Sequence, residues 1–165
     1  MSAIAEFRLL EKSKLEDLRQ ASNIEVKRGL FSKKVIDNFY KFLDSNSRKV
    51  TNFDDSGYVF GNLFVFLQEQ KGIDLLNGEY DEIVNEICSK RGISMFVFTK
   101  THKDNYANLL DSTKFSIEEL IKFNVEFSED NDPEFAKSEL KGILALGESL
   151  NSISEDKDVV ILTIG

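Results

Sequence analysis

The run Val159-Val160-Ile161-Leu162-Thr163-Ile164 is the strongest indication of how this 165-residue chain folds. Acidic residues precede the run at Glu155, Asp156 and Asp158, and five of its six side chains are purely apolar. A short, continuously apolar run that charged residues bound is typical of a strand buried on both faces. We therefore expect a sheet built around this segment, with both of its faces covered.

Two further segments are expected to join this sheet. Residues 3–9 are apolar-rich but interrupted by Glu6 and Arg8, the alternation of a strand with one wet face. Residues 93–98 are β-branched and aromatic, with Met95 and Val97 on one face, and they are expected to form a central strand. The predicted fold class is α+β: a small, mainly three-stranded sheet that uses both termini and residues 93–99, covered by several helices.

Helices are expected where apolar residues recur at three- and four-residue spacing. The candidates are residues 13–21, with a capping box of Ser13 and Glu16; a helix from Ser32 to about 43, after a turn at Gly29; residues 55–72, capped by Asp55 or Ser56; and residues 80–91. Residues 104–110 and 116–123 follow, and then a last helix from Pro133, capped by Asp132, with Phe135, Leu140, Ile143 and Leu144 inward. Residues 44–57 are polar and predict a loop.

Length and composition predict one globular domain over residues 1–165. The chain is 41% hydrophobic and 30% charged, which is ordinary for a folded protein. No apolar run approaches the ~18 residues of a membrane span, and the first residues carry no basic segment followed by an apolar one. A single cysteine, Cys88, forms no internal disulfide. These features predict a cytoplasmic protein.

Charge is distributed unevenly along the chain. The net charge is −8, yet residues 1–50 carry 11 basic against 7 acidic side chains, and residues 51–165 carry 10 against 22. An acidic field repels polyanions, so we expect neither nucleic acid nor an anionic membrane as partner, although a basic patch at Lys27, Arg28, Lys33 and Lys34 could contact a phosphate. An acidic surface favours a basic protein partner and is equally compatible with simple solubility.

Groups able to carry out catalysis are few. His102 follows the strand at 93–98, and Asp104 could orient it as a general base, but the neighbouring lysine and the turn-like context favour a solvated loop histidine. Asp54 and Asp55 could act as a carboxylate pair, or one could simply cap a helix. Cys88 lies on an apolar stripe and reads as a small buried hydrophobe. Glycines are never spaced as in a phosphate-binding loop, and Ser128 to Asp132 lack the glycine of a calcium loop, so no cofactor or dedicated metal is expected.

The segment from Glu126 to Glu134 is the candidate partner-binding site. It places five acids in nine residues, and the predicted contact residues are Glu126, Phe127, Glu129, Asp130, Asp132 and Glu134. Phe53, Phe127 and Phe135 each lie beside acidic residues, and an aromatic inside a charged rim is how a binding hot spot appears in a sequence. We expect a non-catalytic binding protein, foremost a toxin-neutralising immunity protein that occludes a basic partner. The alternatives are a small hydrolase using His102 with Asp104 or the Asp54 and Asp55 pair, or an adaptor of a cellular protein.

Both ends of the chain carry a resemblance. Met1 to Phe7 lead into a helix that Ser13 starts, with Leu15 and Leu18 inward, and the last helix runs into Val159 to Gly165. In these segments, about a third of the chain, the sequence resembles the YfbM-like family of small bacterial domains of unassigned function. Such proteins tend to carry Trp and His in a middle segment, and the comparable residues 58–67 have neither. The resemblance implies a fold and transfers no functional residue.

Overall fold

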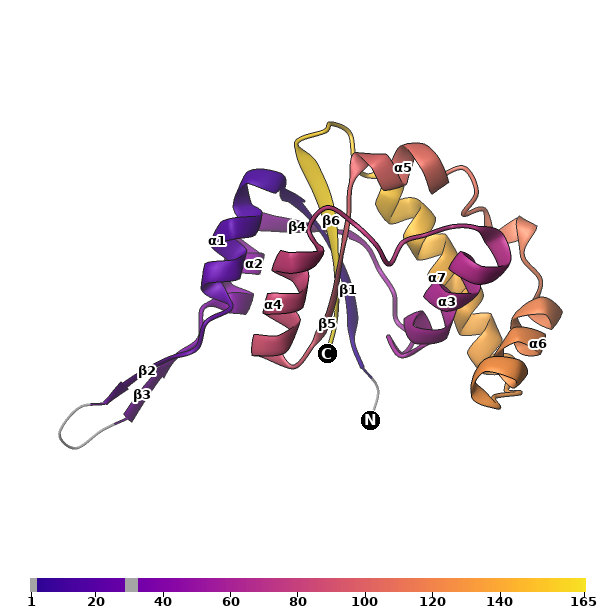
Figure 1. Ribbon diagram of the computed structural model, residues 1–165, viewed down its shortest axis with the longest axis horizontal. Coiled ribbons are helices and arrows are strands. Elements are labelled where there is room, and N and C mark those ends of the chain that lie inside the picture. The colour runs from indigo at the N-terminus through magenta and orange to yellow at the C-terminus, as the bar shows by residue number, and fades with distance from the viewer. Residues whose placement is uncertain (1–2, 29–32) are drawn as a thin grey trace.

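Four strands form one antiparallel sheet in the computed structural model, which describes residues 3–28 and 33–165. They are β1 (Ala5–Glu11), β4 (Ser47–Thr51), β5 (Ser94–Phe98) and β6 (Asp158–Ile164), in the order β4-β1-β6-β5 (Figure 1). The helices are α1 (Leu15–Ala21), α2 (Phe39–Asn46), α3 (Val59–Lys71), α4 (Asp81–Arg91), α5 (Lys100–Tyr106), α6 (Ile117–Ser128) and α7 (Pro133–Asn151). Two 3₁₀ turns, η1 (Lys12–Lys14) and η2 (Ser112–Lys114), and a hairpin of β2 (Glu25–Arg28) and β3 (Lys33–Ile36) complete the described residues.

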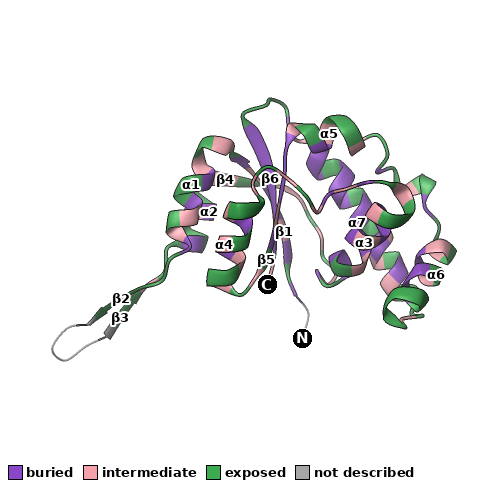
Figure 2. Cartoon of the chain, viewed as in Figure 1, coloured by how far each residue is buried: buried purple, intermediate pink, exposed green. Residues whose placement is uncertain are grey.

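The last strand, β6, lies inside the sheet. It pairs with β1 from Ala5 opposite Ile164 to Glu11 opposite Asp158, and with β5 on its other side. Residues 159–162 have no solvent exposure, and the strand is buried along nearly its whole length (Figure 2). The predicted strand buried on both faces is confirmed, and so is the α+β class.

Each face of the sheet has its own group of helices. Helices α1, α2 and α4 cover one face, and α3, α5, α6 and α7 lie on the other (Figure 1). Because side chains alternate along a strand, Phe7 of β1 enters the larger core beside α3, where its ring meets Phe60 at 5.6 Å, while Leu10 enters the smaller core under α1 and α2. The sheet is thus the common wall of two hydrophobic cores.

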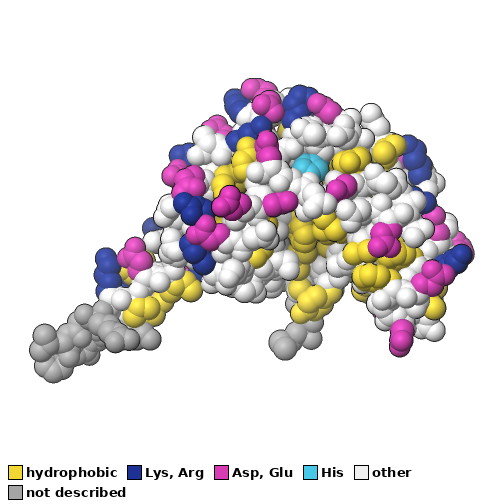
Figure 3. Space-filling view, in the orientation of Figure 1, with side chains coloured by type: hydrophobic (Ala, Val, Ile, Leu, Met, Phe, Trp, Pro, Cys, Tyr) yellow, Lys and Arg dark blue, Asp and Glu magenta, His cyan; other side chains and the backbone are white. Residues whose placement is uncertain are grey.

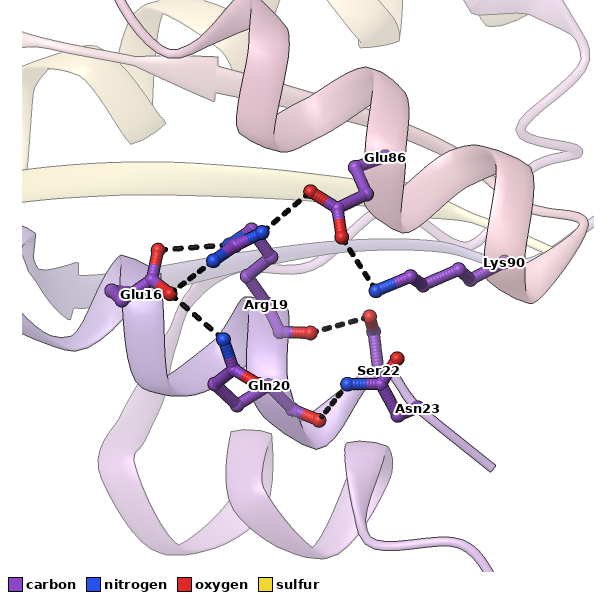
Figure 4. A network of polar contacts seen from close by, with 7 residues as sticks. All are labelled: Glu16, Arg19, Gln20, Ser22, Asn23, Glu86 and Lys90. Carbon is purple, nitrogen blue, oxygen red and sulfur yellow. Dashed lines mark hydrogen bonds and ion pairs between the residues drawn. The ribbon is translucent and has the colours of Figure 1, made fainter. Parts of the chain in front are cut away.

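Ion pairs on the surface join α1 to α4. Arg19 donates to Glu16 on its own helix at 2.8 Å and to Glu86 on α4 at 2.7 Å, and Glu86 also accepts from Lys90 (Figure 4). Directly after α1, Ser22 donates to the carbonyl of Arg19 at 2.6 Å. This network fixes the end of α1, from which the chain leaves for the hairpin.

The sheet has one strand more than predicted, and its order differs. Residues 47–51 lie in the segment predicted as a loop, yet they form β4 at the edge beside β1. Their side chains are mostly polar, as suits an exposed edge, so no apolar alternation marked the strand. Residues 93–98 form a strand as predicted, but β5 is the opposite edge and not the centre, because β6 occupies the middle.

The predicted helix from Ser32 is wrong in its first part. Residues 33–36 form β3, and α2 begins only at Phe39. Val35 lies four residues before Phe39, and Ile36 lies three residues before Phe39 and four before Tyr40, so the spacing resembled a helical stripe. The turn at Gly29 and the start at Ser32 fall outside the described residues.

Several predicted boundaries and caps also differ. The box of Ser13 and Glu16 does not form, because Glu16 binds Arg19 and the serine hydroxyl donates to Glu11. Asp55 caps nothing, and Ser56 only accepts a 3.5 Å bond from the amide of Tyr58, one residue before α3 begins. A helix expected at 104–110 begins at Lys100. Leu144, expected inward on α7, is half exposed.

Three helices have a predicted end residue confirmed, although α6 continues to Ser128, five residues beyond the predicted helix 116–123. Helix α4 ends at Gly92 in the left-handed conformation (φ 64°), α6 begins with a capping box of Ser116 and Glu119, and Asp132 caps α7 ahead of Pro133. No helix within residues 3–28 and 33–165 is both long and apolar enough to cross a membrane.

Candidate functional site

The acidic corner, defined here as residues 126–134, joins α6 to α7. Helix α6 ends when Glu129 adopts a left-handed conformation (φ 59°), and the amide of Asp130 then donates to the carbonyl of Asn124 at 3.2 Å. The chain re-enters a helix at once, because Asp132 accepts from the amide of Glu134 at 2.9 Å. The corner is therefore a tight, hydrogen-bonded turn between two helices.

Its carboxylates have different tasks. Asp130 accepts from the amide of Asp132 at 2.8 Å, so both aspartates shape the turn. Glu134 pairs with Lys137 at 2.5 Å. Glu126 and Glu129 are exposed and form no ion pair within the described part of the chain. They are the carboxylates of the corner that are available to an incoming cation.

Phe127 is the aromatic residue exposed at this corner. Its ring is 49% exposed and stacks on Phe123 with centroids 5.3 Å apart and an interplanar angle of 14°. Acidic and hydrophobic side chains lie side by side at the α6 end of the molecule (Figure 3). Phe53 and Phe135, the other candidate anchors, are partly buried against the large core. Phe127 thus has a fixed ring orientation and an open face.

A buried polar chain lies beneath the corner. Asn62 of α3 donates to Asn124 of α6 at 3.0 Å, and Asn124 donates to the Glu139 carboxylate of α7 at 2.6 Å. Glu139 is fully buried, and its second oxygen has no hydrogen-bond partner among the described residues. Burial raises the pKa of Glu139 to about 7, against the lowering effect of the Asn124 bond. Glu139 is absent from the predicted site residues, although its spacing from Ala136 and Ile143 places it on the inward stripe of α7.

His102 is a buried structural residue and not a solvated loop residue. Its Nδ1 accepts from the amide of Thr99 at 3.0 Å, and its Nε2 donates to the carbonyl of Asn77 at 3.1 Å. The ring closes the capping box at the start of α5 and borders a 350 Å³ cavity. Asp104 binds Lys100 at 2.7 Å and does not contact the imidazole. Both ring nitrogens are occupied, which leaves neither to move a substrate proton.

Two other candidate catalytic residues, Asp55 and Cys88, also have structural surroundings that do not favour catalysis. Lys141 binds Asp55 at 2.8 Å and holds the pKa of that carboxyl below its usual range, which suits an ion pair and not a general acid. Burial raises the pKa of the half-buried Cys88 thiol, which opposes formation of the nucleophilic thiolate. Within the residues that the structure describes, no three His, Cys, Asp or Glu side chains converge on a position for a metal ion.

A groove of 540 Å³ lies where the helices leave part of the sheet uncovered. Glu6 and Arg8 line it from β1, and Asp44 and Lys49 complete its charged lining. The predicted wet face of β1 is largely covered, because Arg8 is only 8% exposed and Leu10 on the same face lies in the smaller core. Arg8 binds Glu6 at 3.1 Å and Asp44 at 2.7 Å, and Lys49 also pairs with Glu6. The charges of the groove therefore neutralise one another and leave no group in need of a ligand.

All six predicted contact residues lie at this corner, with Phe127 as its exposed aromatic. Of its five acids, Glu134 alone forms an ion pair within the described residues, Asp130 and Asp132 accept backbone amides, and Glu126 and Glu129 do neither. The YfbM-like resemblance and the nature of the partner remain predictions. No protein-family model matches this chain, and neither a curated protein nor a solved structure is significantly similar to it.

Proposed function

We propose that this protein is a non-catalytic binding protein, an immunity-type inhibitor that occludes a basic toxin through the acidic corner. The observation that carries the proposal is Phe127, a half-exposed residue whose ring stacks on Phe123, beside the carboxylates of Glu126 and Glu129, which form no ion pair with any described residue. An aromatic anchor inside a charged rim is the usual arrangement of a protein-binding hot spot.

The proposed mechanism is steric and electrostatic. Carboxylates of the corner would attract the Lys and Arg side chains that line a toxin's substrate cleft, and would raise the rate of encounter. Phe127 would then occupy an apolar pocket of that cleft and slow dissociation. The toxin loses access to its substrate, and no bond is made or broken. We further propose that the protein inhibits the toxin in the cytoplasm.

The first experiment removes negative charges from the acidic corner. A variant carrying Glu129→Asn, Asp130→Asn and Asp132→Asn retains side chains that cap helices and tolerate a left-handed backbone, so its stability should stay within about 1 kcal/mol of the wild type. Its association with the product of an adjacent toxin gene should slow about tenfold or more at low ionic strength, with a weaker salt dependence. A control with three exposed acids replaced elsewhere, Glu82→Gln, Glu155→Gln and Asp156→Asn, should associate nearly normally.

The second experiment removes the aromatic ring of Phe127. Phe127→Ala should leave the association rate almost unchanged and raise the dissociation rate about thirtyfold, as loss of a ~2 kcal/mol hot spot requires. Unchanged kinetics in both variants would place the binding face elsewhere. A genome without a neighbouring toxin gene, or no calorimetric binding to its product, would remove the immunity proposal.

An adaptor for a cellular protein is the competing function. The same corner would serve, but with modest affinity. A pull-down from native lysate distinguishes the two, because an immunity-type partner should be recovered alone and survive higher salt than a diffuse electrostatic contact.

A further inference from the structure

The hairpin of β2 and β3, called the arm from here on, extends away from the rest of the molecule (Figure 1). Its strands pair with each other from Glu25 opposite Ile36 to Arg28 opposite Lys33, and within the described residues neither pairs with another strand. A two-stranded hairpin without a core is at best marginally stable in water. Both outer edges of the arm offer unpaired backbone groups to an additional strand.

Apolar side chains of the arm are exposed. Val26 lies directly opposite Val35, and the two are 45% and 57% exposed, with Ile24 at the root 50% exposed. Hydrophobic side chains are visible where the arm joins the body (Figure 3). Among the described residues, neither core includes this pair, so the arm presents a small apolar face that the described part of the body does not cover.

The arm is basic, whereas the remainder of the chain is acidic. Its eight strand residues include four basic side chains and one acidic, a net +3, and the whole chain carries −8. Lys27 lies directly opposite Lys34, and like charges in that position destabilise a pair of strands. The only acid of the arm, Glu25, is 3.8 Å from Lys27. Carboxylates from outside would relieve this repulsion.

Both roots of the arm are fixed to the body. Ser22 and Asn23 donate to the last carbonyls of α1 at 2.6 and 2.9 Å. At the other root, Asp37 accepts from the amide of Phe39 and binds Arg91, which lies over the Phe39 ring at 5.0 Å. A partner strand would therefore meet edges whose base is already held in place.

We propose that the arm binds an extended, acidic segment of a partner protein, which adds to the hairpin as a third strand. Strand addition would satisfy the open edge, and alternation would place the partner's carboxylates on the face of Lys27 and Lys34 and its apolar side chains beside Val26 and Val35. A second copy's arm is unsuitable because two arms of +3 repel. Nucleic acid is unsuitable because phosphates leave the valine pair uncovered and the body repels polyanions. This surface is separate from the acidic corner and does not depend on the immunity proposal.

Amide NMR spectra of the full chain test the inference. The probe is the blocked peptide Glu-Val-Glu-Val-Glu-Val-Glu, titrated to 1 mM. Shifts should be confined to residues 24–28 and 33–36, and the acidic corner should not respond. Lys27→Glu with Lys34→Glu should weaken binding at least tenfold. A control that removes the same charge away from the arm, Lys137→Glu with Lys157→Glu, should change it less than twofold.

Four results would overturn the inference. These are no arm shifts at 1 mM peptide, equal weakening in both double variants, larger arm shifts with a duplex oligonucleotide than with the peptide, or arm shifts that change on dilution of the protein alone. The last two would identify nucleic acid or a second copy as the occupant. Because the arm adds no buried residue to either core, the body amides of each variant report that the fold is intact.

Discussion

Replacing Glu139 by Gln is expected to stabilise the protein, and to do so more strongly as the pH rises. The carboxylate is fully buried between α6 and α7, with one oxygen bound by Asn124 and the other without a partner among the described residues. Gln has nearly the same shape, keeps an oxygen for the Asn124 amide and carries no charge. The substitution removes the cost of a buried negative charge and places the amide NH2 where the carboxylate oxygen has no partner among the described residues. The cost of that NH2 group does not depend on pH, so the pH-dependent part of the change comes from the charge alone.

The magnitude follows from the pKa. A rise in the pKa of Glu139 from 4.5 to about 7 corresponds to about 3 kcal/mol. Between these two pH values the folded protein holds a proton that the unfolded chain has released, so the free energy of unfolding falls as the pH rises from 4.5 to 7 and is level above. The Gln variant lacks this loss. Its advantage over the wild type should grow by up to about 3 kcal/mol between pH 4.5 and pH 8.

Urea denaturation of both proteins across pH 4.5–8 measures this advantage. The difference between the free energies of unfolding of the two proteins at each pH isolates the effect of Glu139, because the other acids of a chain with net charge −8 contribute equally to both. Glu126→Gln, an exposed change on α6, should give a difference that stays constant within about 0.5 kcal/mol. A Glu139→Gln advantage that is the same at pH 5 and pH 8 would refute the reasoning, since the carboxyl would then titrate normally in the fold.

Three further outcomes are expected. Gly142→Ala should cost about 1–3 kcal/mol, because its Cβ would lie 2.9 Å from a leucine side chain of α3, whereas Gly61→Ala meets nothing within 4 Å and should gain about 0.5–1 kcal/mol; thermal unfolding compares them. His102→Ala should lower the free energy of unfolding by about 1–2 kcal/mol through loss of the α5 capping box, and an unchanged urea midpoint would contradict that role. Asp55→Asn should lower the free energy of unfolding by less than about 1 kcal/mol at pH 7, because it removes the ion pair with Lys141. This cost should vanish as the pH falls through the lowered pKa of Asp55, since the carboxyl stabilises the fold only while it is ionised. Acid titration of the stability of both proteins measures the difference.

The sequence predicted those elements whose structure depends only on residues close to them in the chain. The strand β6 is predictable without knowledge of the strands beside it, because six consecutive buried residues next to charged ones are typical of a strand buried on both faces. The caps at Ser116 and Asp132 were readable for the same reason: each needs only the next three residues. Ser13 shows the limit of such a motif, since its intended partner Glu16 found Arg19 instead.

Elements that depend on a distant partner were not predictable. The strand β4 contains one large apolar residue, Val50, and exists because β1 offers an open edge. The arm depends on register, which sets Val26 against Val35, and no periodicity within either strand reveals that pairing. Of the candidate site, the segment was readable as an acidic run beside an aromatic. The buried Glu139 below it was visible only as a charged residue on an apolar stripe.

The central place of β6 has a consequence for how the chain is made. Synthesis proceeds from β1 towards β6, so β1 can take only β4 as a neighbour until residues 158–164 emerge, and β5 has no neighbour at all until then. During that interval one edge of β1, one edge of β5 and the apolar side chains of both cores stay exposed. Chains whose contacts join distant residues are most prone to misassembly while such surfaces are exposed. Anything that delays the arrival of β6, a slow codon or a destabilising change within 158–164, should therefore reduce the yield of folded protein more than its effect on final stability suggests. We therefore expect misassembly to arise in the nascent chain rather than in the finished molecule.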